Sequence, residues 1–312
     1  MIEFKHVYKN YDKNDNTAIN DLNLEIEDGD FFVLVGPSGS GKTTTLKMLN
    51  RLIRQTSGDI LVDGKRIDDY NLREMRLQMG YVLQNIALFP NMTIEENITI
   101  QPESLKWSKE RRHQVAWDLL KKVGLNPLKY AKRMPSELSG GEQQRVGIVR
   151  ALASNPKIVL MDEPFSALDP ISRNQLQELV LKLHKETKMT FIFVTHDMNE
   201  ALRLGNTIAI MRTGHLEQIG SRDEIINNPK NSFVNGFFKN QHNDDKKIKL
   251  IIDSQKCQEI HDQIPELSEE DNISDLAHLL KNKEFVLIKS SDNKVWKVTT
   301  KCLLNYLARE AE

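Results

Sequence analysis

Short runs of consecutive hydrophobic residues recur along the chain. Four of them lack the polar and apolar alternation of a half-exposed strand: FFVLV (31–35), KIVLM (157–161), TFIFVT (190–195) and TIAIM (207–211). Strands buried on both faces have this pattern, so we expect a mostly parallel sheet. Between the runs, NQLQELVLKLHKE (174–186) carries leucines at spacings of three and four residues, which predicts an amphipathic helix. The pattern indicates an α/β fold with helices covering the sheet.

The same patterns predict how the chain is divided. Residues 1–240 would form the α/β body, and a helical subdomain would be inserted in it at about 90–155, where strand patterns are weak. The polar stretch at 241–247 predicts a linker. A tail at 248–312 would form a second, smaller unit.

Composition narrows the class of protein. The chain has 312 residues with 39% hydrophobic and 28% charged positions and a formal net charge of −1, so a nucleic acid or an anionic membrane surface is not expected as its main partner. The start is too polar for a signal peptide, and no apolar run approaches the roughly 18 residues of a spanning helix, so a cytosolic position is expected. Cys257 and Cys302 are expected to be reduced packing residues.

A phosphate-binding loop follows the first hydrophobic run. GPSGSGKTT matches G-x-x-x-x-G-K-[ST] between a predicted strand and a predicted helix, which is the context this motif requires. Backbone N–H groups and the helix N-terminus would hold phosphate oxygens, Lys42 would reach the β- and γ-phosphates, and the Thr43 hydroxyl would ligate Mg²⁺. The nucleotide-binding residues predicted here are Gly36, Pro37, Ser38, Gly39, Ser40, Gly41, Lys42, Thr43 and Thr44.

Two acids close the next hydrophobic run, at the sheet edge where ligands of open α/β folds gather. Asp162 would hold Mg²⁺, and Glu163 would act as the general base toward the water that attacks the γ-phosphate. As a dipeptide alone, the pair would equally suit a solvated acidic turn.

Two further side chains follow hydrophobic runs. His196 comes directly after TFIFVT, so three strands would bring the loop, the two acids and His196 to one edge of the sheet. There it would hydrogen-bond the γ-phosphate and orient the water, although a lone histidine is more often structural. Gln84, after YVL, would touch Mg²⁺ or the water; taken singly it is a surface glutamine.

In order and spacing, these motifs resemble the ATP-binding subunits of ABC transporters over nearly all of residues 1–240. The motifs that carry the resemblance are the Walker A loop GPSGSGKTT, the Q-loop at Gln84, the signature LSGGEQQR (138–145), the Walker B strand ending at Glu163, the segment SALD (166–169) and the switch histidine His196. The resemblance implies a P-loop fold with a RecA-like, mostly parallel sheet, an antiparallel β part and a helical subdomain. It also implies ATP and Mg²⁺ as ligands.

The resemblance further implies a head-to-tail dimer, expected to be of identical chains. The signature residues Ser139, Gly140, Gly141 and Glu142 would cap the γ-phosphate of ATP held by the Walker A loop of the partner. Such a helix N-terminus offers a hydroxyl and N–H groups to an anion without having to serve its own chain's ATP. Asp169 would lie at the dimer interface, although before Pro170 it also suits a helix cap. Tyr11, or the nearby Tyr8, would stack on adenine.

Within the family, the segments around 46–53, 72–98 and 161–173 look most like the ATPases of bacterial importers for glycine betaine, carnitine or choline. Importers of other amines or amino acids remain the alternative. The implied partners are transmembrane permease subunits and an extracellular solute-binding domain or protein, and the implied location is the cytoplasmic face of the membrane. Leu88 and Phe89 would receive a permease helix, or would pack in the core.

The tail resembles a single CBS motif. Its expected elements are a strand IKLII, a helix ISDLAHLLK, strands FVLI and VWKV, and a helix KCLLNYLA. The nucleotide-binding form of the motif ends in Gly-x-x-Thr-x-x-Asp, where this chain has Trp296, Thr299 and Cys302. Because the acid is missing, the prediction is a dimerisation or regulatory tail.

The motifs disfavour two other classes of function. An ABC ATPase of DNA repair or translation would carry coiled coils, zinc modules or two cassettes, and this chain has one cassette, no C-x-x-C pair and no basic excess. A regulatory subunit without hydrolysis would be expected to lack Glu163 or His196, and both are present.

Overall fold

The structure is a computed structural model of the chain, and it describes residues 1–11, 17–166, 168–241, 258–260, 267–269, 271, 273–281, 283–290 and 294–310. The chain divides into two compact units, Met1–Asn235 and Gly236–Glu312, each with a hydrophobic core of its own. Apart from Gln241, the expected linker and the strand IKLII lie outside the described residues, as does Cys257. Within the part that is described, no helix combines the length and hydropathy needed to span a bilayer.

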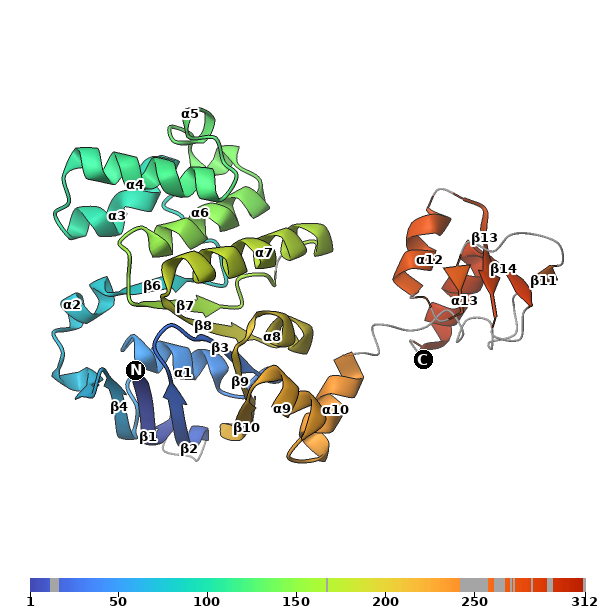
Figure 1. The fold of residues 1–312 in the computed structure, drawn as a ribbon, viewed down its shortest axis with the longest axis horizontal. Helices are drawn as coiled ribbons and strands as arrows, with labels where there is room; N and C mark the ends of the chain where they lie inside the picture. The colour runs from blue at the N-terminus through green and yellow to red at the C-terminus, as the bar shows by residue number, and fades with distance from the viewer. Residues whose placement is uncertain are drawn as a thin grey trace. The chain divides into compact units, whose positions relative to one another are not determined.

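A six-stranded sheet forms the centre of the first unit (Figure 1). Its order is β10–β9–β3–β8–β7–β6, and all neighbouring pairs are parallel except β9 with β10. The bounds are β3 Phe31–Val35, β6 Met79–Val82, β7 Ile158–Asp162, β8 Thr190–Thr195, β9 Thr207–Arg212 and β10 His215–Gly220. The four hydrophobic runs are therefore β3, β7, β8 and β9, which confirms the α/β fold with its mostly parallel sheet.

The two faces of this sheet pack against different layers. Alternate side chains Phe32, Leu34, Ile192 and Val194 join the core formed with helix α1 (Lys42–Leu49) and a second sheet. On the other face Phe31 and Phe191 contact His184 of helix α7 (Pro170–Thr187), with ring centroids 5.1 Å apart in both pairs. Both faces are covered, which is why the strands are hydrophobic at every position.

The second sheet is antiparallel and has the order β2–β1–β4–β5. Its strands are β1 Ile2–Asn10, β2 Thr17–Ile26, β4 Ser57–Val62 and β5 Lys65–Arg66. Strand β2 alternates buried and exposed residues from Leu22 to Ile26, as expected for a sheet with one face on the core and one in water.

Helices fill residues 94–152, where the helical subdomain was expected, and lie together beyond β6 (Figure 1). They are α3 Ile94–Ser104, α4 Lys109–Lys122, α5 Pro127–Tyr130, the 3₁₀ turn η2 Pro135–Glu137 and α6 Gly140–Leu152. The remaining helices of this unit are η1 Ile67–Asp69, α2 Leu72–Leu77, α8 Met198–Leu204, α9 Arg222–Asn227 and α10 Ser232–Gln241, whose last residues belong to the second unit.

The second unit contains a small sheet of order β11–β14–β13–β12, in which only β12 and β13 are parallel. Its elements are β11 Gln258–Ile260, β12 Leu267–Ser268, α12 Ile273–Leu280, β13 Phe285–Lys289, β14 Val295–Thr299 and α13 Thr300–Glu310. The expected helices and the strands FVLI and VWKV are present, whereas β11 and β12 were not predicted because they are two or three residues long. The assignment to a CBS motif stays a prediction.

A buried asparagine holds the connection between β6 and α3. Asn97 is fully buried, accepts a hydrogen bond from Phe89 N at 2.8 Å and donates to the carbonyl oxygens of Phe89 (3.1 Å), Met92 (3.0 Å) and Thr93 (3.0 Å). The side chain adds to the backbone hydrogen bonds from Met92 N to Phe89 O (3.2 Å) and from Asn97 N to Thr93 O (2.9 Å), and it also pairs Phe89 N and Met92 O in this irregular segment.

Replacing Asn97 with leucine, which has a similar shape and no polar atoms, is expected to lower the free energy of unfolding by about 3 kcal/mol, because several buried groups lose their partners. The measurements are urea unfolding and hydrogen exchange at the Phe89 amide, which should become faster. Asn91→Leu, at an exposed position of the same segment, is the matched control. Equal losses of stability in the two variants would contradict the assigned role of the Asn97 amide.

Candidate functional site

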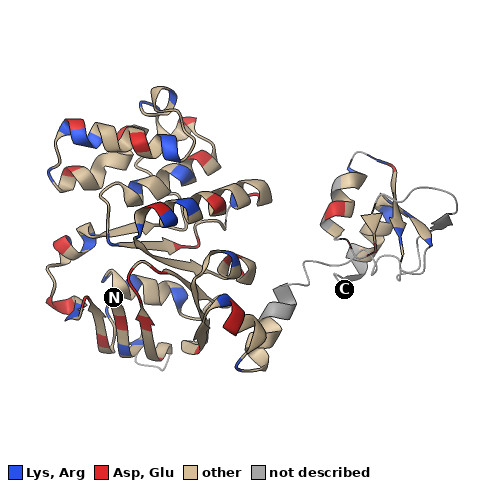
Figure 2. Cartoon of the chain, in the orientation of Figure 1, with Lys and Arg blue, Asp and Glu red and all other residues tan. Residues whose placement is uncertain are grey.

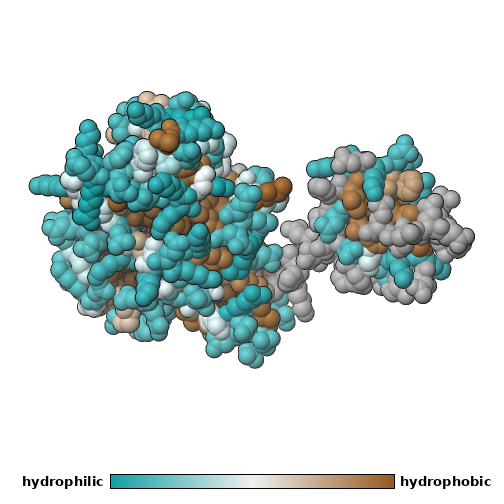
Figure 3. All heavy atoms as spheres, turned by 45° about the horizontal axis from the view of Figure 1, so that its top comes forward, coloured by the Kyte–Doolittle hydropathy of each residue, from teal (hydrophilic) through white to brown (hydrophobic). Residues whose placement is uncertain are grey.

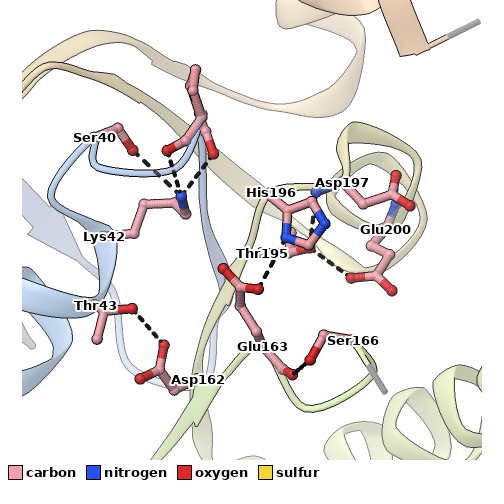
Figure 4. A network of polar contacts seen from close by, with 12 residues as sticks. Ser40, Lys42, Thr43, Asp162, Glu163, Ser166, Thr195, His196, Asp197 and Glu200 are labelled. Atoms are coloured by element: carbon pink, nitrogen blue, oxygen red, sulfur yellow. Dashed lines mark hydrogen bonds and ion pairs between the residues drawn. The ribbon is translucent and has the colours of Figure 1, made fainter. Parts of the chain in front are cut away.

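A cavity of about 800 Å³ lies where the carboxyl ends of β3, β7 and β8 meet the start of α1. Most of the residues that the sequence singled out contribute to its wall. The lining residues are Tyr11, Ala18, Pro37, Ser38, Gly39, Ser40, Gly41, Lys42, Thr43, Thr44, Gln84, Glu163 and His196. Figure 4 shows side chains of three separate segments pointing toward one another here.

The loop between β3 and α1 passes too close to β2 for a side chain at its last position. Gly41, the N-cap of α1, has φ 103°, which favours glycine. A Cβ atom on Gly41 would lie 2.5 Å from Ile19 Cδ1 and 2.7 Å from the Ala18 carbonyl oxygen. Glycine is therefore required at this position, and the first residues of α1, Lys42 to Thr44, line the cavity with the helix N-terminus.

The ammonium group of Lys42 is held inside this loop. Lys42 Nζ donates to the carbonyl oxygens of Gly36 at 2.7 Å and Pro37 at 2.9 Å and lies 3.4 Å from Ser40 Oγ (Figure 4). Burial lowers the pKa of Lys42, and the nearby carboxylates of Glu163 and Asp162 oppose that shift. The charge is thus fixed in position before any ligand arrives.

Two oxygen donors lie side by side at the far end of the loop. Thr43 Oγ1 donates to Asp162 Oδ1 at 2.7 Å, across 119 positions of sequence. Burial raises the pKa of Asp162, while the Thr43 hydrogen bond acts against the shift. A hydroxyl and a carboxylate are hard ligands of the kind Mg²⁺ takes alongside substrate phosphates and water, so these residues fit that ion. Among the described residues no group of three or more His, Cys, Asp or Glu could hold a metal ion.

Glu163 has an unusual backbone conformation. Its φ is +44°, in the left-handed region that a non-glycine residue rarely adopts, and its N–H donates to Val194 O at 3.0 Å. Its carboxylate Oε2 lies 3.0 Å from His196 Nδ1, which comes from the end of β8 (Figure 4). Ser166 Oγ also donates to the Glu163 carbonyl oxygen at 3.1 Å. A carboxylate and an imidazole are therefore paired at the cavity wall.

Tyr11 and Gln84 lie on opposite parts of the rim. Tyr11 is 54% exposed, and its hydroxyl is 3.2 Å from Thr44 Oγ1, so the ring stands beside the phosphate loop. Tyr8, the competing aromatic, is not among the residues that line the cavity. Gln84 follows β6 and is exposed.

Comparison with known proteins agrees with this arrangement. The ABC transporter family model matches residues 19–166. The glycine betaine/carnitine/choline transport ATP-binding protein OpuCA of Bacillus subtilis is 49% identical over 237 residues, which are 76% of this chain and 62% of that protein. The glycine betaine uptake system ATP-binding protein YehX of Escherichia coli is 44% identical over 76% of both chains. The chain belongs to the ABC transporter ATP-binding family.

The match spans 62% of the length of OpuCA, so this ABC chain corresponds to only part of that protein. Two solved structures show the cassette as a dimer. A bacterial ABC transporter cassette is 36% identical with a TM-score of 0.64, and a cassette bound to ADP and Pi in a post-hydrolysis state is 35% identical with a TM-score of 0.63. Each match covers 71% of this chain and 99% of the other.

The signature of this ABC chain lies at a different place from the phosphate loop. Ser139 caps α6, with Glu142 N donating to Ser139 Oγ at 3.3 Å and Ser139 N donating to Glu142 Oε2 at 2.8 Å. A separate cavity of about 250 Å³ is lined by Ser139, Gly141, Glu142 and residues of α7. Gly140 stands in the open, since a Cβ there would meet nothing within 4 Å.

Asp169 is the N-cap of α7. Its Oδ1 accepts from Ile171 N at 3.1 Å and Ser172 N at 3.0 Å. Hydrogen bonding to the Ser172 side chain, and then these backbone contacts, lower the pKa of Asp169. The cap that was the alternative interpretation of Asp169 is therefore present. Neither Asp169 nor the signature residues line the cavity that holds Lys42.

Several contacting residues were missed by the sequence analysis. Ala18 lines the cavity from β2 with no signal in its residue type. Thr195 and Glu200 are hydrogen-bonded to each other next to His196, and the pattern THDMNE gave no signal for this contact, because an acid three residues after Asp197 predicts a capping box instead. Tyr130, which donates to Glu142 Oε1 at 2.6 Å, comes from a short helix that no local pattern connects to the signature.

The hydrogen bond from Tyr130 is the largest cause that lowers the pKa of Glu142 from its usual 4.5, ahead of the backbone of Ser139. Tyr130→Phe is therefore expected to raise this pKa toward 4.5. A lowered carboxylate pKa stabilises the fold above the unfolded-state pKa and loses that contribution as pH falls through the folded-state pKa, so the variant should lose less stability on acidification.

The measurement is a ¹³C NMR titration of the Glu142 carboxyl in the wild type and in Tyr130→Phe. Glu224 provides an internal control, because it forms the same kind of capping box with Ser221, has a lowered pKa and lacks a tyrosine among its causes. A Glu142 pKa that does not move, or one that moves together with that of Glu224, would contradict the assigned contact.

Proposed function

We propose that the chain is the ATPase subunit of an importer and hydrolyses ATP as a head-to-tail dimer. The observation that carries the proposal is the cavity lined by Lys42, Thr43, Glu163 and His196, in which Thr43 is hydrogen-bonded to Asp162 and Glu163 is paired with His196. A cation, two hard oxygen ligands and a paired carboxylate are the groups that phosphoryl transfer to water requires.

Each group has a role in the proposed reaction. The loop N–H groups and Lys42 would bind the β- and γ-phosphates, and Tyr11 would stack on the adenine. Glu163 would accept a proton from the attacking water while the water oxygen forms a bond to the γ-phosphorus. The bond between the γ-phosphorus and the β–γ bridging oxygen would break, and its electrons would stay on ADP. His196 would hold the Glu163 carboxylate through Nδ1 and contact the γ-phosphate.

Thr43 and Asp162 would hold Mg²⁺, with Gln84 as a further oxygen donor from the rim. When bound, the ion supplies positive charge against the phosphate oxygens. The protein itself contributes the placement of these donors, which the Thr43–Asp162 hydrogen bond already fixes.

A shared nucleotide would explain why one chain has two glycine-rich anion sites. Ser139, Gly140 and Gly141 open α6 outside the cavity of Lys42, so within one chain they cannot grip the same phosphate. In the dimer they would cap ATP bound to the partner, with Glu142 holding the turn and Asp169 near the interface. Dimeric cassettes among the solved relatives support this arrangement.

A groove of about 1,090 Å³ supports a membrane partner. It is lined by α2, the end of β6, residues 83 and 87–90, part of α3 and Arg150, whose Nη1 donates to Ala87 O at 2.6 Å. Phe89 in this groove is 48% exposed, which favours docking over core packing for that residue. An amphipathic helix of a permease subunit would fit this groove. The proposed location of the chain is therefore the cytoplasmic face of a bacterial membrane.

The cargo is proposed from the solutes for which the relatives are named. OpuCA, YehX and a carnitine transport ATP-binding protein of Listeria monocytogenes (51% identical) are named for glycine betaine, carnitine or choline, so a quaternary ammonium solute is proposed, delivered by an extracellular solute-binding domain or protein. Another amine or an amino acid is the alternative. Solute-stimulated hydrolysis in the complex with its permease distinguishes them.

A nucleic-acid motor is disfavoured by the charge distribution. Lys and Arg are interspersed with Asp and Glu over helices such as α4 and α7 (Figure 2), and the formal net charge is −1. Figure 3 shows a face that is mainly hydrophilic, interrupted by separate hydrophobic patches. Nucleic-acid binders carry instead a clustered basic surface.

Glu163→Gln tests the general base. The amide keeps the size of the side chain and cannot take the proton, so we expect turnover to fall by about 100-fold or more with ATP affinity nearly unchanged. ATP should then hold the dimer together, which light scattering measures as a doubled mass. Turnover close to the wild type would remove Glu163 from this role.

Mixing two defective variants tests the shared site. Lys42→Ala removes a phosphate-binding charge, and Gly140→Asp introduces a carboxylate that would repel the partner's γ-phosphate, at a position where a side chain has room. A heterodimer of the two would contain one site with both defects and one intact site. Random pairing gives about half heterodimers, so the mixture should recover about a quarter of wild-type hydrolysis.

Lys42→Ala and Gly140→Asp, each mixed with wild type, are the controls for random pairing. A mixture no more active than its two components, while wild type mixed with Lys42→Ala keeps hydrolysing, would exclude composite sites.

A further inference from the structure

A buried polar contact lies directly behind His196. Thr195 Oγ1 donates to Glu200 Oε2 at 2.7 Å, and Asp197 N donates to the same hydroxyl at 3.0 Å (Figure 4). Thr195 and Glu200 are buried, the latter with 7% of its surface exposed. The Thr195 hydroxyl therefore links Thr195 and Asp197, the two neighbours of His196 in the chain, to the buried carboxylate of Glu200.

The conformation of Glu200 is not the one its local sequence predicts. Asp197-x-x-Glu200 is the pattern of a capping box, in which the glutamate would turn back to the N-cap backbone. Asp197 Oδ1 does cap the helix, accepting from Asn199 N at 2.7 Å and Glu200 N at 3.3 Å. The Glu200 carboxylate points inward instead and accepts from Thr195 and, at 3.3 Å, from Gln177 Nε2. Burial raises the pKa of Glu200, as expected for a carboxyl group in this position.

The contact continues into α7. Gln177 Oε1 accepts from Arg203 Nη1 at 2.8 Å, and Arg203 also donates to Asn174 Oδ1 at 2.7 Å and pairs with Glu178 at 2.6 Å. Thr195, Glu200 and Gln177 therefore join the end of β8 to the middle of a helix whose first residue is capped by Asp169.

The backbone of the turn between β8 and α8 sets the position from which the His196 ring reaches Glu163. The His196 side chain is 58% exposed, and its Nδ1 lies 3.0 Å from Glu163 Oε2. A buried carboxylate is a costly way to stabilise a turn, since apolar residues of similar volume often serve stability as well or better. The buried carboxylate does fix one hydrogen-bonded geometry, because a buried network in which every group has a partner has few alternative arrangements.

We propose that Thr195 and Glu200 are positioning residues that orient His196 toward Glu163 and the γ-phosphate. The inference rests on the proposed role of His196 in hydrolysis. Neither residue would touch nucleotide, as neither lines the cavity. They act by holding the backbone on both sides of the histidine.

Hydrogen-bond accounting predicts what a conservative change does. In Glu200→Gln one amide oxygen and one NH₂ group replace two acceptors, while Thr195 Oγ1–H and Gln177 Nε2 both remain donors toward that position. With the amide oxygen toward Thr195, the NH₂ group faces Gln177 Nε2, which is also a donor. With the oxygen toward Gln177, the NH₂ group donates to Thr195 Oγ1, and the Thr195 proton loses its acceptor. The mismatch disturbs the turn although size and shape are kept.

The main test is a double-mutant cycle in the full chain between Thr195→Val and His196→Ala. Thr195→Val is expected to lower kcat for ATP about tenfold with KM within about twofold, because the cavity is intact and only the direction of His196 is lost. Thr195→Ser, which keeps the hydroxyl, should restore kcat to within about twofold. In the His196→Ala background, Thr195→Val should cause no further loss.

The outcomes separate the two hypotheses. If His196→Ala alone leaves kcat unchanged, the proposed role of His196 fails and the positioning role fails with it. If His196→Ala lowers kcat and Thr195→Val lowers it tenfold more in that background, only the positioning inference is overturned.

A second measurement covers the case in which Thr195→Val does not fold. Long-range ¹H–¹⁵N spectra report the imidazole of His196, identified by the signal lost in His196→Ala. Glu200→Gln should shift that signal and lower kcat with unchanged KM. A wild-type His196 signal in Glu200→Gln would overturn the inference.

Discussion

The register of three buried parallel strands determines the site. Val35 pairs with Thr195 across β3 and β8, and Asp162 pairs with Val194 across β7 and β8. The strands therefore end at one level, and whatever follows each of them enters the same space. A shift by one residue would turn the side chains to opposite faces and separate the phosphate loop from the acids.

The last hydrogen bond between β7 and β8 also accounts for the backbone conformation of Glu163. Its N–H donates to Val194 O and continues the pairing of β7 with β8, while its φ of +44° turns the chain out of the sheet immediately afterwards. Such a conformation costs of order 1 kcal/mol or more and persists only where the surroundings impose it. The strain places the carboxylate 3.0 Å from His196 Nδ1 and not along the strand.

The site is built from charges that burial disfavours. Moving an ion from water into a protein interior costs roughly several kcal/mol for each ion, even after the protein has relaxed around it. Lys42 offsets the cost with two carbonyl oxygens and a hydroxyl, and Asp162 with the hydroxyl of Thr43. These neighbours come from the loop after β3 and from the first turn of α1, so the phosphate loop itself supplies the groups that stabilise both charges.

Local sequence patterns predicted those features of the fold that depend on the residues of a single segment. The hydrophobic runs gave the strands, and the glycine spacing gave the phosphate loop, because both depend on the residues of one segment. The inward turn of Glu200 could not be predicted, since it depends on Gln177 of α7, and the contact of Tyr130 with Glu142 depends on how α5 packs beside α6. In the tail, elements of two or three residues such as β12 are too short to leave a pattern.

The separation of the two glycine-rich turns has an energetic consequence. If the N–H groups at the start of α6 faced their own Lys42, ATP would bind to one chain and its binding energy would stay within it. With the two in different cavities, the proposed dimer lets the γ-phosphate satisfy both by joining two chains, and ATP binding would then favour association by mass action. Cleavage of the γ-phosphate would remove the contacts of α6, so in this proposal the dimer interface is the element whose equilibrium the reaction shifts.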